Sequence, residues 1–324
     1  MAKKGDSKKV VVAALIGNGG IALAKFVAAA LSGSATMLAE GVHSMADTCN
    51  QALLLLGMSL SKKMSPEHYP LGRYKESYFW AFIVSLMLFF LGGVFAIYEG
   101  VHKLMHADEP PGSPLVPLIV LLVSIGLEAG SFFVAFREFN KSRGKRPIME
   151  ALFAGKDPII PVVLLEDTGA VFGLIFALIA VAVTWITGNP AFDAIGSIVI
   201  GVLLCIIGIL LARDTRSLLL GERASEELEQ TAMEQAKSTP GVEGVTQLLS
   251  MHLGPNAVML ALKVHLRAGM ALEEVERVID QIEARIQAAV PDAKKIFIEP
   301  DSDYEESRDP ERSLFPRPPT TSAR

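Results

Sequence analysis

The stretch that decides the fold is Tyr78-Phe-Trp-Ala-Phe-Ile-Val-Ser-Leu-Met-Leu-Phe-Phe-Leu-Gly-Gly-Val-Phe-Ala-Ile-Tyr-Glu-Gly-Val101. Its only charged residue is Glu99, close to its end. A helix needs about 20 mostly apolar residues to cross the hydrocarbon core of a bilayer. Because irregular backbone cannot face lipid, the stretch is predicted to be one transmembrane helix.

Five further apolar blocks accompany it on both sides. The chain is 51% hydrophobic and 20% charged, whereas soluble domains carry about 25% charged residues. We expect a six-helix membrane domain over residues 1–213. The other five blocks are Val10–Leu31, Ala35–Leu60, Pro114–Phe136, Ile159–Ile186 and Ala191–Leu211.

Basic residues are sorted between alternate connections of these helices. One set of connections holds nearly all of them, whereas the opposite set offers a single cation, Lys103. Because basic loops stay in the cytoplasm, both termini are predicted to be cytoplasmic. The start, Met1–Lys9, has neither a cleavage site nor a transit-like amphipathic pattern, so we expect a bacterial inner membrane.

The remainder of the chain follows the pattern of a small α+β domain. The order helix, strand, strand, helix, strand predicts a ferredoxin-like αββαβ domain over 214–300, with its helices on one face of an antiparallel sheet. Residues 301–324 are rich in Pro, Ser and charge and are predicted to be disordered. The five elements are expected at Ala224–Ser238, Val242–His252, Val258–Arg267, Leu272–Val290 and Lys295–Glu299.

Ionisable residues inside the second span indicate a metal site. Glu40, His43 and Asp47 are three and four residues apart, which places them on one face of a helix with Ser44 and Gln51. A charge buried in a bilayer is costly and is usually functional. An imidazole and a carboxylate one turn apart suit Zn²⁺. Alternatively, the two groups only hydrogen-bond each other.

The fifth span contributes two adjacent carboxylates, Glu166 and Asp167, which point about 100° apart on a helix. One could bind metal while the other pairs with Lys25 of the first span or takes up a proton. The alternative is that both mark a helix end near the interface. Glu128, in the fourth span, is a further buried carboxylate to which the sequence assigns no role.

Longer motifs around these residues resemble a known family. The stretch Ser32–Asn50, with His43-Ser-Met-Ala-Asp47, and the loop His68-Tyr-Pro-Leu-Gly-Arg73 resemble the cation diffusion facilitator family. Leu164–Val171 and Gly188–Ser197 are similar to its zinc transporter 9 subgroup. The resemblance implies a homodimer that exchanges cytoplasmic metal for protons by alternating access.

The resemblance also implies a transport site made by a His/Asp pair on each of two spans. His43 and Asp47 match the first pair, and Asp167 matches half of the second. Val163 stands where the second histidine is expected, with Glu166 the nearest substitute and a bound water the alternative. Since oxygen replaces nitrogen, discrimination for zinc should weaken, and Val163→His should sharpen it.

These observations predict a secondary transporter that exports a divalent metal ion from the cytoplasm in exchange for protons, with zinc as the leading candidate. The alternatives are a manganese, iron or cobalt carrier and a non-transporting scaffold. An intramembrane metalloenzyme is disfavoured because no His-Glu-x-x-His motif is present. We expect a lipid bilayer and a second copy as partners, no nucleic acid and no cofactor, and we assign no metal to the C-terminal His252 and His265.

Overall fold

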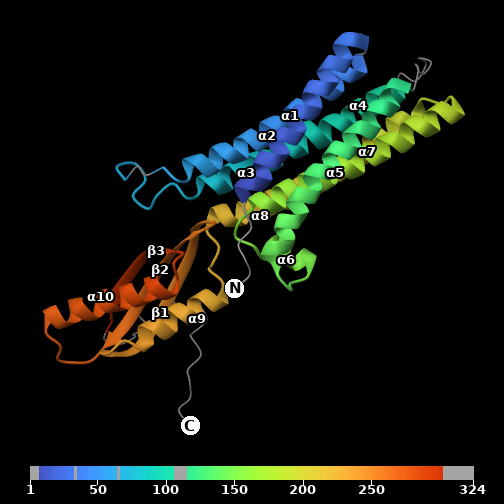
Figure 1. Cartoon of the computed structure of the whole chain (residues 1–324). Helices are drawn as coiled ribbons and strands as arrows, with labels where there is room; N and C mark the ends of the chain where they lie inside the picture. The colour runs from blue at the N-terminus through green and yellow to red at the C-terminus, as the bar shows by residue number, and fades with distance from the viewer. Residues whose placement is uncertain (1–6, 33–34, 64–65, 106–114, 302–324) are drawn as a thin grey trace. The chain divides into compact units, whose positions relative to one another are not determined.

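The computed structural model describes residues 7–32, 35–63, 66–105 and 115–301 (Figure 1). Within these ranges, the side chains of 28–29, 31–43, 116–117, 150 and 153–154 are not described. The chain forms two compact units, Met1–Leu219 and a second unit that begins at Leu220. The tail predicted to be disordered lies, from residue 302 onward, outside the described residues.

Every apolar block of the first unit forms a helix. The last helix, α8, runs to Leu220 rather than ending at Leu211, and Thr215 and Leu218 beyond that point are buried. The elements are α1 (Ser7–Ser32), α2 (Ala35–Leu60), α3 (Glu76–Met87), η1 (Leu88–Val94), α4 (Phe95–Met105), α5 (Leu115–Arg143), α6 (Ile148–Ala154), α7 (Ile159–Thr187) and α8 (Ala191–Leu220).

The first unit is a helical membrane domain. Five helical stretches among the described residues are long and apolar enough to cross a bilayer: Ser7–Val27, Glu76–Met105, Leu118–Arg143, Ile159–Thr187 and Ala191–Leu220. The helix α2 is not one of them, and its sequence carries the polar residues expected of the metal site. A sixth crossing by α2 therefore stays a prediction.

The apolar stretch Tyr78–Val101 is helical throughout but is not a uniform α-helix. Its middle, η1, has π-helical hydrogen bonding between α3 and α4. There Gly93 meets α8 so closely that a Cβ atom on it would lie 2.8 Å from the backbone nitrogen of Cys205. A Cβ atom on Gly201 of α8 would in turn lie 2.7 Å from the carbonyl oxygen of Gly93. The two helices thus touch backbone to backbone.

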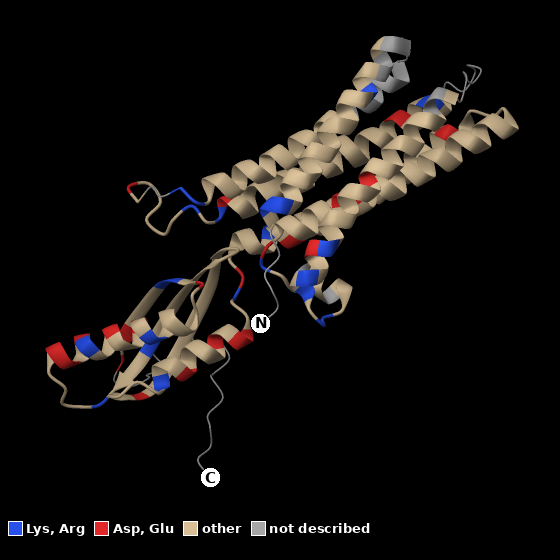
Figure 2. Cartoon of the chain, in the orientation of Figure 1, with Lys and Arg blue, Asp and Glu red and all other residues tan. Residues whose placement is uncertain are grey.

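Helices α1, α2, α5 and α7 pack together and form the part of the unit that holds the polar side chains. Their shared core includes Val11 of α1, Leu54 of α2, Phe139 of α5 and Val163 of α7. Basic side chains gather at one end of this unit (Figure 2). Among the described residues at the other end, Lys103 contacts Glu99 at 3.2 Å and Asp193 at 3.4 Å.

The second unit has the predicted order αββαβ. Its elements are α9 (Glu226–Lys237), β1 (Val242–Gly254), β2 (Ala257–Leu266), α10 (Leu272–Ala289) and β3 (Ala293–Pro300). The strand order is β1-β2-β3. Strands β1 and β2 are antiparallel, with Leu248 opposite Leu262, whereas β2 and β3 are parallel, with Leu260 opposite Ile296.

The prediction of an antiparallel sheet was therefore wrong, because the sheet is mixed. The chain leaves β2, crosses through α10 and returns beside β2 in the same direction, which is the geometry of a helical crossover. The core lies between one face of β2, including Leu260 and Leu262, and the helices, including Ala232 of α9 and Ile282 of α10. Both helices cover the same face, as the sequence predicts.

Candidate metal centre in the membrane unit

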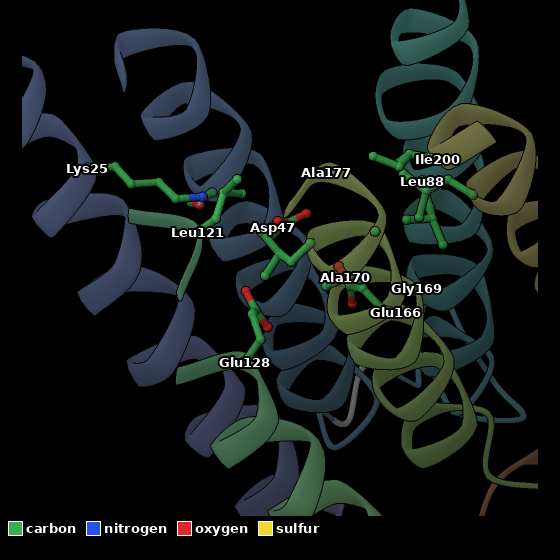
Figure 3. A pocket seen from close by; sticks show the side chains of 14 residues that line it. Lys25, Asp47, Leu88, Leu121, Glu128, Glu166, Gly169, Ala170, Ala177 and Ile200 are labelled. Carbon is green, nitrogen blue, oxygen red and sulfur yellow. Dashed lines mark hydrogen bonds between the residues drawn. The ribbon is translucent and has the colours of Figure 1, made fainter. Parts of the chain in front are cut away.

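A cavity of about 100 Å³ lies among the helices of the first unit (Figure 3). Most of its lining is apolar and comes from α5, α7, α8 and η1. Its polar lining is small and consists of Lys25 of α1, Ser44 and Asp47 of α2, Glu128 of α5 and Glu166 of α7. Four helices therefore contribute ionisable groups to one cavity.

The second-span motif contributes Asp47 to this cavity, where its side chain is partly buried. The backbone of α2 also passes through Glu40 and His43, but their side chains lie outside those that the structure describes. Asp47 follows His43 by four residues, so the two positions lie on one face of the helix. The structure thus places one of the two predicted second-span ligands in the cavity.

The carboxylate of Glu166 is held by α2. It is 4% exposed, and it accepts a hydrogen bond of 2.9 Å from Asn50 Nδ2 and one of 2.7 Å from Gln51 Nε2. Each carboxylate oxygen receives one of these bonds, and each retains a second lone pair for another partner. Glu166 is therefore fixed in orientation while remaining able to bind an ion.

The neighbouring carboxylate points to a different helix. Asp167 is 1% exposed and accepts a hydrogen bond of 2.9 Å from Ser131 Oγ of α5. It is not among the residues that line the cavity. Because the two side chains leave α7 about 100° apart, Glu166 reaches α2 and Asp167 reaches α5. The reading of both as markers of a helix end loses support, since α7 extends from Ile159 to Thr187 around them.

Two further ionisable groups line the cavity. Lys25 is buried, and its Nζ donates a hydrogen bond of 2.9 Å to Ser44 Oγ. Glu128 is 5% exposed, and it lies close enough to Asp47, Asp167 and Lys25 to interact with them electrostatically. The first and fourth spans therefore contribute charge to the same site as the second and fifth.

The acidic groups share one region without meeting at one point. In the part of the chain with described side chains, no three of His, Cys, Asp and Glu lie close enough together to hold one metal ion. Val163, the position where the resemblance implies a histidine, is fully buried in the apolar core and does not line the cavity. An ion held by the described carboxylates alone would have to draw them together.

Sequence reasoning missed some of the groups that organise this site. Asn50 and Ser131 hold Glu166 and Asp167, but neither stood out, because single amides and hydroxyls are common in transmembrane helices. A usable signal was the pair Asn50-Gln51, two adjacent amides within an otherwise apolar run. Glu128 was recognised as buried but received no role.

The second unit has no comparable centre among its described residues. The ring of His265 contacts Glu243 at 3.3 Å through Nε2 and the carbonyl oxygen of Asp301 at 3.1 Å through Nδ1. His252 is buried, and its backbone N–H donates a hydrogen bond of 2.8 Å to the carbonyl oxygen of Glu222. His265 thus makes contacts through its ring and His252 through its backbone, both within the second unit.

Comparison with known proteins decides the family. A family model described as the cation efflux transmembrane domain matches residues 11–220. The chain belongs to the cation efflux family. A second model, described as the cytoplasmic domain of cation efflux proteins, matches residues 224–303 and covers the αββαβ unit. The family resemblance drawn from the His43–Asp47 motif is therefore confirmed.

Three relatives illustrate the range of this family. The Mus musculus protein named proton-coupled zinc antiporter SLC30A9, mitochondrial, is 34% identical over 81% of this chain and 46% of the relative. Metal tolerance protein C4 of Arabidopsis thaliana is 30% identical over 82% of this chain and 59% of the relative. The magnetosome protein MamB of Paramagnetospirillum magneticum is 25% identical over 86% of this chain and 89% of the relative. The chain thus spans about half the length of the SLC30A9 relative.

Proposed function

We propose that this member of the cation efflux family is a secondary transporter that carries a divalent metal ion out of the cytoplasm in exchange for protons. Zinc is the leading candidate for this ion. The observation that carries the proposal is the cavity that Asp47, Glu128, Glu166 and Lys25 line from four helices. Family membership and the name of the mouse relative, a proton-coupled zinc antiporter, support the choice of ion and counter-ion.

The charge of the cavity suits such an exchange. Three carboxylates and one ammonium group line it, which leaves a formal charge of −2 when all are ionised. An uncompensated charge of this size is costly in a low-dielectric interior. One divalent cation or two protons neutralise it equally well. The site therefore favours two states, one with metal and one with protons, and disfavours an empty ionised state.

We assign the ion to His43 and Asp47 of α2 together with Glu166 and Asp167 of α7. Asp47 and Glu166 already line the cavity, whereas Asp167 accepts a hydrogen bond from Ser131 of α5 and would have to reorient to reach the ion. Since Val163 supplies no donor atom, oxygen outnumbers nitrogen in this set. Hard oxygen ligands tolerate Mn²⁺, Fe²⁺ and Co²⁺ as well as Zn²⁺, and these ions form the second candidate cargo.

The remaining parts of the proposal concern topology and assembly. Six crossings, with α2 as the second, bring both termini to the cytoplasmic side, in agreement with the basic side chains at one end of the unit (Figure 2). The chain acts as a homodimer, as the family resemblance implies. We place it in a bacterial inner membrane; a mitochondrial membrane, which the name of the mouse relative states, is the competing location.

The test is metal-driven proton movement in proteoliposomes that contain the purified full chain and a trapped pH-sensitive dye. A zinc gradient should move protons in the opposite direction, and Asp47→Ala should abolish this movement while the protein still elutes as a folded species. The matched control is Asp193→Ala, which removes a partly exposed carboxylate that contacts Lys103 away from the cavity. Metal-driven proton flux that persists in Asp47→Ala contradicts the assignment of Asp47 to the site. The absence of any metal-driven proton flux in the original chain contradicts transport and favours a scaffold.

A further inference from the structure

The carboxylate of Glu128 is a buried acidic group that lines the cavity. It is 5% exposed, and its Oε2 atom has no hydrogen-bond donor among the described residues. Its side chain rises from α5 toward the cavity that Asp47 and Glu166 also line (Figure 3). A buried polar atom without a partner costs about 1–3 kcal/mol, and more when the group is charged. Such an arrangement calls for a ligand that satisfies the oxygen.

The neighbouring carboxylates differ from Glu128 in this respect. Both oxygens of Glu166 accept amide hydrogen bonds from α2, and Asp167 accepts one from Ser131. Ser131 lies one turn after Glu128 on α5, so the same face of this helix already holds one carboxylate of α7. Glu128 is thus the group through which α5 can contribute directly to whatever enters the cavity.

We propose that Glu128 is a direct ligand of the transported ion and supplies the donor that is missing at Val163. This inference rests on the proposed function. Val163 is buried in the apolar core and does not line the cavity, whereas Glu128 lines it from the opposite helix. The ion would then bridge three helices, α2, α5 and α7. Rotation of the flexible glutamate side chain brings its free oxygen to the ion.

Lys25 fits the same scheme as the counter-charge of the site. Its ammonium group is anchored to Ser44 at 2.9 Å and interacts electrostatically with Glu128. When no metal is bound, the lysine offsets part of the negative charge that Glu128 adds. Glu128 therefore adds an oxygen donor to the metal-bound state. In the metal-free state, Lys25 lowers the electrostatic free-energy cost of the charge on Glu128.

The experiment is metal binding by the purified full chain, with Co²⁺ as a spectroscopic probe and Zn²⁺ in competition. The absorption bands of bound Co²⁺ report the number and kind of its donor atoms. Glu128→Gln should weaken metal binding at least tenfold and change the Co²⁺ spectrum. Glu128→His should restore binding with a spectrum altered by the nitrogen donor. A loss of charge alone would lower affinity while leaving the spectrum unchanged.

The control is Glu99→Gln, which removes a carboxylate of α4 that contacts Lys103 at the far end of the unit. It should change neither the metal affinity nor the Co²⁺ spectrum. If Asp47→Asn loses binding while Glu128→Gln keeps the affinity and spectrum of the original chain, the proposed function stands and this inference is wrong. If neither variant alters binding, the proposed function fails as well. If Glu128→Gln does not fold, Glu128→His decides, because an unchanged Co²⁺ spectrum in that variant overturns the inference.

Discussion

Gln51 Nε2 donates a hydrogen bond of 2.7 Å to Glu166 Oε2 and so joins the second and fifth spans at the candidate metal centre. Gln51 is fully buried, and the bond links residues that are 115 positions apart in the chain. Asn50 reinforces it with a second bond to the same carboxylate. The orientation of Glu166 toward the cavity is therefore set by α2 rather than by its own helix.

The first prediction follows from this bond. Gln51→Leu keeps the size of the side chain but removes the donor, so Glu166 should lose its fixed orientation. Groups that orient metal ligands typically contribute 10–100-fold to affinity, and we expect a decrease in zinc affinity of that order. Competition binding with a chromogenic chelator measures it. As a control, Ser61→Ala removes a hydroxyl that bonds only locally to Met58 at the end of α2 and should leave affinity unchanged. An unaltered affinity in Gln51→Leu would show that Glu166 needs no support.

Glu166→Gln tests the carboxylate itself. Asn50 and Gln51 both present N–H donors to this position, whereas an amide there offers only one acceptor atom. One buried donor then loses its partner, at a cost of about 1–3 kcal/mol. We expect lower thermal stability, weaker metal binding and a flatter pH dependence of transport. Glu166→Asp, which keeps the charge, should retain more of all three properties. Transport with unchanged affinity and pH profile would mean that a water completes the coordination.

Val163→His introduces the histidine that the resemblance implies. Val163 is fully buried in the apolar core, and a larger side chain there forces its neighbours to move at a cost of about 1–3 kcal/mol. We therefore expect a lower melting temperature. Because Val163 does not line the cavity, selectivity for Zn²⁺ over Mn²⁺ should sharpen only when the repacking turns the new imidazole toward the ion. Thermal unfolding and competition binding measure the two effects. Val163→Leu is the control, because it adds volume without a nitrogen and should reproduce only the first effect.

The cytoplasmic unit should fold and dimerise without metal. Its core of β2, α9 and α10 is continuous, the ring of His265 contacts Glu243 and Asp301, and no metal-binding group of three side chains is found among its described residues. Calorimetry on a fragment that begins at Leu220 should give the same melting temperature with and without a chelator. Ile282→Ala, which truncates a fully buried side chain, should by contrast destabilise the fragment by about 2–5 kcal/mol. A large decrease in melting temperature on adding the chelator would reveal a structural metal.

Gly93→Ala probes the close contact between η1 and α8. The added Cβ atom would lie 2.4 Å from Cys205 Sγ and 2.8 Å from the backbone nitrogen of the same residue, so the helices must separate. We expect a lower melting temperature in detergent and less folded protein. Gly130→Ala on α5 meets nothing within 4 Å and should be neutral or slightly stabilising. Equal stability of the two variants would show that the contact is not important for folding.

Much of the architecture could be predicted because it rests on local signals. Length and hydropathy located the helices, and the alternation from Val258 to Leu266 located β2. The parallel pairing of β3 could not be predicted, since it depends on which edge of β2 the chain reaches after α10. The π-helical turn of η1 also lacks a sequence signature, because it depends on how α8 packs against it.

The candidate site was predictable in composition but not in arrangement. A charge in an apolar helix is conspicuous, so Asp47, Glu128, Glu166 and Asp167 could all be found from the sequence. Helical geometry also gave the divergence of Glu166 from Asp167. The partners of these carboxylates lie on other helices, as Ser131 does for Asp167, and helix pairing is not encoded within any single segment.

The glycine contact between η1 and α8 has a mechanical consequence. At this contact the side chain of Cys205 in α8 lies against Gly93, and the side chain of Ile97 in α4 lies against Gly201, so each glycine leaves room for a side chain of the facing helix and the helices interlock. Packed helices with interdigitating side chains resist sliding, whereas smooth surfaces shear with little change in side-chain rotamers. Leu88 of η1 and Leu204 of α8 both line the cavity. Sliding of these helices along each other is therefore resisted, and the parts of the cavity wall that Leu88 and Leu204 form keep a fixed register.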